Sequence, residues 1–372
     1  MRFICNKSDL TNAVNIVQKA ALSNSTSPVL MGILLEAKGD TLSLTCNNLE
    51  IAICNVIPAQ VDMEGSVVVK CSLFSDIIRK VDGDLVHINV NENMVANIVC
   101  GGSNYDISGF KIDEFPVLPV VDKKSSVTIT KRQLKDLIKC TTFAAGISES
   151  KLILTGCLVE IKNGEITMVA VDGFRLAIRT IKTNADTDAS FVIPAKSLNE
   201  LSKIIEDSDD NVEIIISDKN ICFVYDGVKF VSRLLEGDYI PYEKIIPSDF
   251  KTIVKVRSAE FERAVERASL IVTNEISKGP LESPLIIEIN EGGLEMSCEN
   301  QLGKSEERIF PSIDGEALKI GFNHKYLLDA VKVCPEDEYF IGFGSPQSPC
   351  LIYPADGNNA FKYIVVPVKL RG

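Results

Sequence analysis

The sequence VTITKRQLKDLIKCTTFAA at residues 127–145 reads as a short alternating strand that runs directly into an amphipathic helix. Thr130 and Gln133 have the spacing of a capping box, whose side chains satisfy backbone N–H groups at a helix start. One set of residues follows the i, i+3, i+4, i+7 spacing of a buried face, and a basic set occupies an adjoining sector. The apolar set is Leu134, Leu137, Ile138 and Thr141, and the basic set is Lys131, Arg132, Lys135 and Lys139. One face of this helix therefore needs a core, and the next concentrates positive charge.

The same strand and helix pattern occurs twice more along the chain. It is found in RFICNKSDLTNAVNIV at the N-terminus and in IVKVRSAEFERAVERA near residue 255; Leu10 and Phe261 lie 124 and 127 residues from Leu134. A second helix pattern follows each unit after 64 to 66 residues, preceded by the strands SVVVKC, SFVIPA and ALKIGF. The apolar sets of the first helices are Leu10, Ala13, Val14 and Val17, and Phe261, Ala264, Val265 and Ala268; those of the second helices are Phe74, Ile77, Ile78 and Val81, then Leu198, Leu201, Ser202 and Ile205, and Leu327, Ala330, Val331 and Cys334. Chance coincidence of two amphipathic helices per unit is the alternative, but order, spacing and preceding strands all match. We therefore predict three copies of one domain, at residues 1–120, 121–248 and 249–372.

Composition and patterning give the fold class. The strands come in consecutive runs broken by Gly–Asp and Asn turns, which indicates an α+β fold with two helices packed on antiparallel sheets in each domain. No apolar run reaches the roughly 18 residues of a membrane span, and MRFICNKSDL lacks the apolar core of a signal peptide. The 11 cysteines stand without a CxxC pair. We expect a cytoplasmic protein with buried free thiols, no metal site and no cofactor.

The charge of the predicted helices has the opposite sign to the net charge of the chain. The chain carries −12, which by itself argues against binding to nucleic acid. The six predicted helices together carry +5, so the remaining residues must carry −17. If the helices face one way, they form a mildly basic surface that is suited to sequence-independent contact with phosphates. The alternative is that helices are simply where solvated lysines lie. The helices are predicted at residues 7–22, 72–81, 131–145, 196–206, 258–272 and 324–334.

Several longer motifs carry a resemblance that covers the whole chain. They are SPVLMGILLEAKGDTLSLTCNNLEIAI, LILTGCLVEI, MVAVDGFRLAI, FVIPAKSLNEL, LEGDYIPYEKIIP, KIGFNHKYLLDAV and YIVVPVKL. In this order and spacing the chain resembles the bacterial sliding clamps, the beta subunits of DNA polymerase III. The resemblance implies a non-catalytic processivity factor, a head-to-tail homodimer that closes into a ring of six domains with helices lining the hole. Such a ring encircles duplex DNA of any sequence and slides on it.

The resemblance also implies a hydrophobic cleft between the second and third domains. There the family binds short linear motifs of the DNA polymerase III catalytic subunit, the clamp loader, other DNA polymerases and repair proteins. Without the resemblance, VDGFRL reads as an Asp–Gly turn and IVVPVKL as a core strand, although Pro367 suits a sheet edge better. Phe174 and Val171 replace histidine and threonine of many members, so we expect a more apolar cleft. The matching residues are Leu154, Val171, Gly173, Phe174, Arg175, Leu176, Ile240, Lys244, Ile245, Asn323, Tyr326, Ile364, Val365, Val366, Pro367, Val368 and Leu370.

Two further sets of residues follow from the resemblance. The ring interface would pair an edge of domain one with an edge of domain three. With Gly102, Ser72 and Asn104 in place of basic residues of relatives, we expect few ion pairs there. The interface residues are Tyr105, Ile107, Ile271, Val272, Glu299, Glu306 and Glu307. The DNA-facing residues implied by the family are Asn24, Ser148, Lys151, Leu152 and Ile153, to which the basic helix positions Lys131, Arg132, Lys135, Lys139 and Lys196 are added.

Two rival functions remain at this point. The first is an enzyme that uses Asp172 and Glu160 as an acid/base pair, but no histidine stands near either in sequence. No P-loop, GxSxG, HExxH or Gly-rich dinucleotide turn occurs in the sequence. The second is a repeat scaffold that binds proteins and not DNA, which would show no retention on circular DNA.

Overall fold

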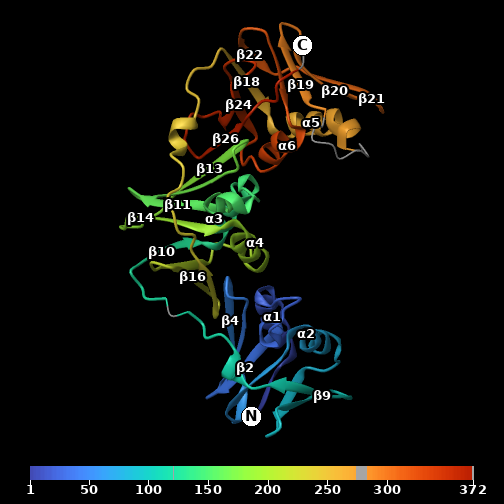
Figure 1. Ribbon diagram of the computed structural model, residues 1–372, viewed down its shortest axis with the longest axis vertical. Helices are drawn as coiled ribbons and strands as arrows, with labels where there is room; N and C mark the ends of the chain where they lie inside the picture. Colours follow the sequence, from blue (N-terminus) through green and yellow to red (C-terminus); the bar gives the residue numbers. More distant parts are fainter. Residues whose placement is uncertain (120, 274–282, 371–372) are drawn as a thin grey trace. The chain divides into compact units, whose positions relative to one another are not determined.

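The computed structural model describes residues 1–119, 121–273 and 283–370 (Figure 1). Within this part of the chain, strand, helix, strands, helix, strands occurs three times in the predicted order. The threefold repeat and the α+β class are therefore confirmed. The helices are α1 (Lys7–Val17), α2 (Cys71–Lys80), α3 (Lys131–Lys139), α4 (Ala195–Ile204), α5 (Ser258–Thr273) and α6 (His324–Lys332).

The N-terminal repeat places its two helices side by side against its strands, as Figure 1 shows. The apolar positions of α1 are buried as predicted, because the i, i+3, i+4, i+7 spacing turns them to one side. Asn6 caps α1, since its side chain accepts a hydrogen bond from the N–H of Ser8. The strands are β1 (Arg2–Asn6), β2 (Gly32–Lys38), β3 (Thr41–Asn47), β4 (Ile51–Pro58), β5 (Gln60–Met63), β6 (Gly65–Lys70), β7 (Leu85–Val90), β8 (Val95–Cys100) and β9 (Ser103–Phe110), with 3-10 turns η1 (Gln18–Ala20), η2 (Pro28–Met31) and η3 (Ile112–Glu114).

The central repeat differs from its prediction at the end of α3. The helix ends at Lys139 rather than near residue 145, and a short 3-10 turn follows. The hydroxyls of Thr141 and Thr142 donate to the carbonyls of Leu137 and Ile138, at 2.7 and 2.9 Å, which offers the chain an alternative to further helix. The elements are β10 (Ser125–Thr130), η4 (Thr142–Ala144), η5 (Glu149–Thr155), β11 (Gly156–Lys162), β12 (Glu165–Val171), β13 (Arg175–Lys182), β14 (Ala189–Pro194), β15 (Asn211–Ile216), β16 (Asn220–Tyr225) and β17 (Val228–Arg233).

The C-terminal repeat packs α5 and α6 against each other and α5 against β20 and β21 (Figure 1). The apolar positions predicted for α5 are all buried. Those of α6 are buried up to Val331, while Cys334 follows the helix end and is half-buried. The elements are η6 (Tyr242–Ile245), β18 (Thr252–Arg257), β19 (Leu285–Asn290), β20 (Gly293–Asn300), β21 (Gly303–Ile309), β22 (Ser312–Gly315), β23 (Leu318–Phe322), β24 (Glu338–Phe343), β25 (Cys350–Pro354) and β26 (Phe361–Val365).

The chain forms two compact units, and the central repeat contributes to both. The first unit holds a sheet of thirteen antiparallel strands, in which β17 of the central repeat pairs with β4 of the N-terminal repeat. The second unit holds a sheet of nine strands, in which β13 pairs with β26, and a sheet of four strands. The units are Met1–Arg132 with Asn199–Leu234, and Gln133–Leu198 with Leu235–Gly372.

The cysteines are free thiols, and ten of the eleven are buried. This agrees with the expectation from their scattered positions. No helix in the described residues is long and apolar enough to cross a membrane.

Candidate peptide-binding, DNA-facing and interface residues

The turn between β12 and β13 is built around Asp172. Its Oδ1 accepts hydrogen bonds from the backbone N–H groups of Phe174 and Arg175, at 2.9 and 3.0 Å. Gly173 has a φ of 95°, a left-handed conformation that glycine adopts without steric cost. The Asp–Gly turn read from VDGFRL is therefore present, and it fixes the start of β13.

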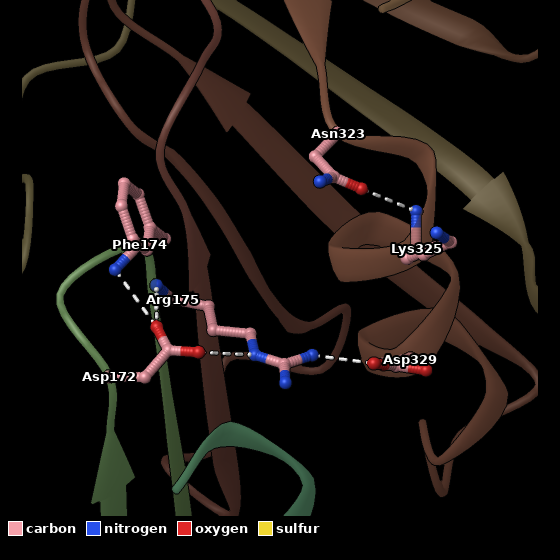
Figure 2. A network of polar contacts seen from close by, with 6 residues as sticks. All are labelled: Asp172, Phe174, Arg175, Asn323, Lys325 and Asp329. Carbon is pink, nitrogen blue, oxygen red and sulfur yellow. Dashed lines mark hydrogen bonds and ion pairs between the residues drawn. The ribbon is translucent and has the colours of Figure 1, made fainter. Parts of the chain in front are cut away.

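Arg175 links this turn to α6, a helix of the C-terminal repeat (Figure 2). Its guanidinium lies between two carboxylates, with Nε 2.9 Å from Oδ2 of Asp172 and one terminal nitrogen 2.5 Å from Oδ2 of Asp329. The same group stands 4.6 Å from the ring centre of Tyr326 and 5.6 Å from that of Phe143. The side chain of Arg175 is only 13% exposed, and its charge is already paired. It therefore holds the turn and α6 in position and presents little charge to a ligand.

Phe174 is exposed although it is aromatic. It keeps 58% of its surface in contact with solvent, while its ring stacks on Tyr326 at 6.0 Å between centroids. Asn323 caps α6, with its Oδ1 accepting from the N–H of Lys325 at 2.9 Å (Figure 2). Phe174, Tyr326 and Asn323, which the resemblance to the family assigned to one site, all lie where β13 meets the start of α6.

An apolar cluster continues from this turn. It contains Leu154, Val171, Leu176 and Ile364, with Ile240 packed against it. Five of the predicted cleft residues are thus in one cluster. Ile245 does not belong to it and is 44% exposed, and the neighbouring Lys244 on η6 is exposed too. The members that the sequence did not predict are Leu158, Val169, Ile178, Val192, Leu235, Tyr239, Tyr242, Ile246, Phe250, Leu351 and Tyr353.

The segment after β26 is fixed by two backbone hydrogen bonds. β26 pairs with β13 and ends at Val365, two residues before Pro367. The N–H of Val366 then donates to the carbonyl of Phe174, and the N–H of Val368 donates to that of Gly321, both at 2.8 Å. The last described residue, Leu370, packs against Gly321, where a side chain would meet it at 2.6 Å. Pro367 therefore lies beyond the strand, as its missing N–H requires.

Lys131 requires a correction to the predicted basic face. Its side chain is 2% exposed, and its Nζ pairs with Asp226 and, at 3.4 Å, with Asp210. The ammonium also stands 5.8 Å from the ring centre of Tyr225. The prediction that Lys131 presents its charge to solvent was wrong, because carboxylates far along the chain fold over it.

The other predicted DNA-facing residues differ in their surroundings. Arg132 is exposed, but it pairs with Asp207 at 3.0 Å and with Asp209 at 2.9 Å, so its charge is largely compensated. Lys135 is half-buried, and Ile153 packs on the apolar cluster. The exposed ones are Asn24, Lys139, Ser148, Lys151, Leu152 and Lys196.

The predicted interface residues divide into exposed and buried ones. Tyr105 on β9 is 41% exposed and Ile271 on α5 is half-buried, whereas Ile107 and Val272 are 7% and 5% exposed. Ile107 and Val272 therefore belong to the core of their own repeats. Glu299 is exposed, Glu306 pairs with Lys304, and Glu307 pairs with Arg267 at 2.8 Å. The hydrogen bond from Arg267 holds the pKa of Glu307 below its ordinary value.

The two carboxylates of the enzyme hypothesis, Asp172 and Glu160, each have structural partners in the fold. Asp172 holds the turn and Arg175, and Glu160 accepts a hydrogen bond of 2.6 Å from the hydroxyl of Tyr242. Burial and this carboxylate raise the pKa of Tyr242. The described residues contain no group of three or more His, Cys, Asp or Glu that could hold a metal ion.

Comparison with known proteins identifies the family. The N-terminal, central and C-terminal domain families of the DNA polymerase III beta subunit match residues 1–119, 128–241 and 243–369. The chain is 34% identical to the beta sliding clamp of Bacillus subtilis strain 168, covering 99% of this chain and 100% of the relative. It is 31% identical to the beta sliding clamp of Staphylococcus epidermidis strain RP62A, over 99% of each.

Solved structures agree with these relatives. The crystal structure of the DNA polymerase sliding clamp from Bacillus subtilis superposes with a TM-score of 0.95, at 33% identity over the whole of both chains. The sliding clamp from Pseudomonas aeruginosa bound to griselimycin gives 0.92 at 26% identity, again over the whole of both chains. The chain therefore belongs to the family of DNA polymerase III beta subunits, the beta sliding clamps, which are non-catalytic processivity factors.

Proposed function

We propose that two copies of the chain close head to tail into a ring that encircles duplex DNA. The observation that carries this proposal is the repetition of one domain three times within one protomer, because two such protomers supply six equivalent segments for a closed ring. The domains of the ring are residues 1–120, 121–248 and 249–372, the last of which extends beyond the described residues. The ring works with the replicative polymerase in the cytoplasm.

The surface around Phe174 and Tyr326 is the proposed docking site for partners. It combines the exposed ring of Phe174 stacked on the half-buried Tyr326, a buried apolar cluster and the segment after β26. Such a surface suits a short extended peptide whose apolar side chains fill pockets while main-chain groups fix its direction. The peptides would come from the DNA polymerase III catalytic subunit, the clamp loader, other DNA polymerases and repair proteins.

The proposed hold on DNA depends on topology more than on charge. The burial of Lys131 and the pairing of Arg132 leave little uncompensated positive charge at the start of α3. Each phosphate contact strengthens binding through counterion release, so weak contacts favour sliding. Encirclement supplies the retention that charge does not.

Retention on circular DNA tests this function. The full-length chain is loaded onto a nicked circular plasmid with clamp loader and ATP, and the DNA-bound fraction is separated by gel filtration. We expect the protein to stay on the circle and to leave when the plasmid is cut once. A scaffold that does not encircle DNA would show neither behaviour, and binding that survives the cut would contradict the ring.

A further inference from the structure

A hollow in the C-terminal repeat lies away from the apolar cluster. Its volume is about 470 Å³, and it lies beside β22, the turn between β19 and β20, and the Phe310–Pro311 segment that joins β21 to β22. This volume falls within the range of pockets that bind small ligands or short peptides. None of its lining residues belongs to the sites described above.

β22 presents a free strand edge to this hollow (Figure 1 shows β22 beside β18). Within the described residues β22 pairs only with β18, at one end of the nine-stranded sheet. The N–H of Glu316 donates to the carbonyl of Lys251, which sets the alternation of the ladder. Asp314 then bonds toward β18, and the backbone N–H and C=O of Ile313 point away from it. Ile313 is also among the residues that line the hollow.

An exposed aromatic side chain stands at the entrance to the hollow. Phe310 is 76% exposed, and its ring lies over Gly293, where a side chain would meet Cδ1 at 3.1 Å. The φ of 120° at Gly293 is a second reason why glycine occupies this position. Phe310 also borders a neighbouring hollow of about 300 Å³. It is therefore an apolar anchor beside the edge of β22 that no other described strand pairs with.

The charges of the hollow favour one kind of occupant. Glu291 and Glu316 are the charged residues among those that line it, and both are exposed. Glu316 forms an exposed ion pair with Lys251 at 3.8 Å, which solvent screens, whereas Glu291 has no ion pair among the described residues. A second copy of the chain paired edge to edge would bring acidic residues, including Asp314, against their own copies, which is unfavourable. A basic segment would be attracted by the same residues.

We propose that the free edge of β22 binds an extended segment of a partner protein that alternates apolar and basic side chains. The segment adds a strand to the sheet through the main chain of Ile313, places an apolar side chain on Phe310, and directs basic side chains to Glu291 and Glu316. β22 has only four residues and follows Pro311, so the added strand is short. This surface is separate from the docking site at Phe174.

Fluorescence anisotropy with the full-length chain tests the proposal. The probe is the labelled peptide Lys-Val-Lys-Val-Lys, compared with Glu-Val-Glu-Val-Glu and with the lysine peptide N-methylated at every residue. We expect the lysine peptide to bind and both comparison peptides to bind at least about tenfold more weakly, which corresponds to about 1.4 kcal/mol. Equal binding of the N-methylated peptide would overturn the added strand.

Matched variants distinguish this site from general attraction to an acidic protein. The double variant Glu291→Lys/Glu316→Lys should lower the affinity for the lysine peptide at least about tenfold. The control Glu92→Lys/Glu206→Lys changes the net charge equally at exposed positions elsewhere, and it should change the affinity by less than about twofold. Equal effects of the two pairs would overturn the proposal. Phe174→Ala should leave binding of the lysine peptide unchanged, since the two surfaces are separate. A changed solution mass in the Glu291/Glu316 variant would instead indicate a second copy at this edge, and would also overturn the proposal.

Discussion

Lys131 lies in the first turn of α3, where Asp210, Asp226 and Tyr225 enclose its ammonium group. Burial by itself lowers the pKa of this lysine, but the hydrogen bonds and charges of Asp226 and Asp210 outweigh it and raise the pKa above its ordinary value. A helical wheel could not predict this environment. The carboxylates stand 79 and 95 residues further along the chain, at the ends of other elements.

The first prediction concerns Lys131→Met, which keeps an unbranched stem and removes the charge. We expect the free energy of unfolding at pH 7 to fall by about 1 kcal/mol, because the partner carboxylates are exposed and the pair is partly screened. The hydrogen bond from Ser208 lowers the pKa of Asp210 in the fold, and the hydrogen bond and charge of Lys131 lower it further. This carboxylate therefore stabilises the fold above its unfolded pKa, near 4, and ceases to do so as the pH falls through the lowered value. The difference between variant and parent should shrink below about pH 4.

Urea unfolding at neutral and acidic pH measures this effect. Lys139→Met is the matched control, since Lys139 is exposed on the same helix, and it should change stability by less than about 0.5 kcal/mol. If the two variants were equally stable at pH 7, the enclosed ion pair would contribute nothing.

The second prediction concerns Phe174, whose ring is exposed and stacked on Tyr326. Phe174→Ala should lower the affinity for a polymerase-derived peptide about tenfold, because the exposed aromatic ring is lost. The melting temperature should change little, because most of the ring is already in water. Phe310→Ala removes another exposed phenylalanine outside this site and serves as the control in the same titration. Equal peptide affinity of the two variants would remove Phe174 from the docking site.

At the scale of elements, periodicity in the sequence predicted the helices closely. The 3.6-residue spacing identified all six, and the predicted apolar residues are buried from Leu10 in α1 to Val331 in α6, while Ser202 and Cys334 are half-buried. Helix ends were less predictable. The end of α3 depends on the hydroxyls of Thr141 and Thr142, which are compatible with a continued helix in the sequence but bond back to carbonyls in the fold.

Strand partners between repeats could not be predicted from the residues alone. β4 pairs with β17, and β13 pairs with β26, across long stretches of sequence. Alternation shows which face of a strand is buried but not which strand lies beside it. The same limit applies to the site: Asp329 stands one turn after Tyr326 on α6, and only the fold shows that both meet Arg175.

The third prediction concerns the segment after β26. Deleting the chain from Val366 removes the backbone hydrogen bonds to Phe174 and Gly321 and the contact of Leu370 with Gly321. Because β26 ends at Val365, the nine-stranded sheet keeps its ladder. We expect a stability loss of about 1–3 kcal/mol from the two hydrogen bonds, an unchanged solution mass, and no detectable binding of the polymerase-derived peptide. Calorimetric titration measures the binding, and unchanged affinity would contradict the assignment of the chain end to the docking site.

At the scale of the whole molecule, the proposed ring would close through apolar residues that the protomer leaves partly exposed. Ile271 is half-buried, and Leu270 beside it is 58% exposed. The fourth prediction is that Ile271→Glu gives monomers, because closing the interface would bury an unpaired carboxylate. Sedimentation should then report about 40.7 kDa in place of twice that mass. Val117→Glu, at a residue that is 86% exposed, should leave the dimer intact, and a dimer in both variants would exclude Ile271 from the interface.

The fifth prediction distinguishes retention by encirclement from retention by electrostatic attraction to phosphates. Lys139 and Lys151 are exposed predicted DNA-facing residues, and their double replacement by glutamate should shorten the DNA made per binding event about two- to tenfold. Retention on a closed circle should persist, because a ring without phosphate contacts still cannot leave it. Lys38→Glu with Lys229→Glu changes the same charge on strands β2 and β17 and should leave processivity unchanged. Primer extension and plasmid retention at low and high salt measure both effects. The Lys139/Lys151 variant could instead be retained on circular DNA no better than on linear DNA. In that case charge, and not encirclement, would hold the protein on the duplex.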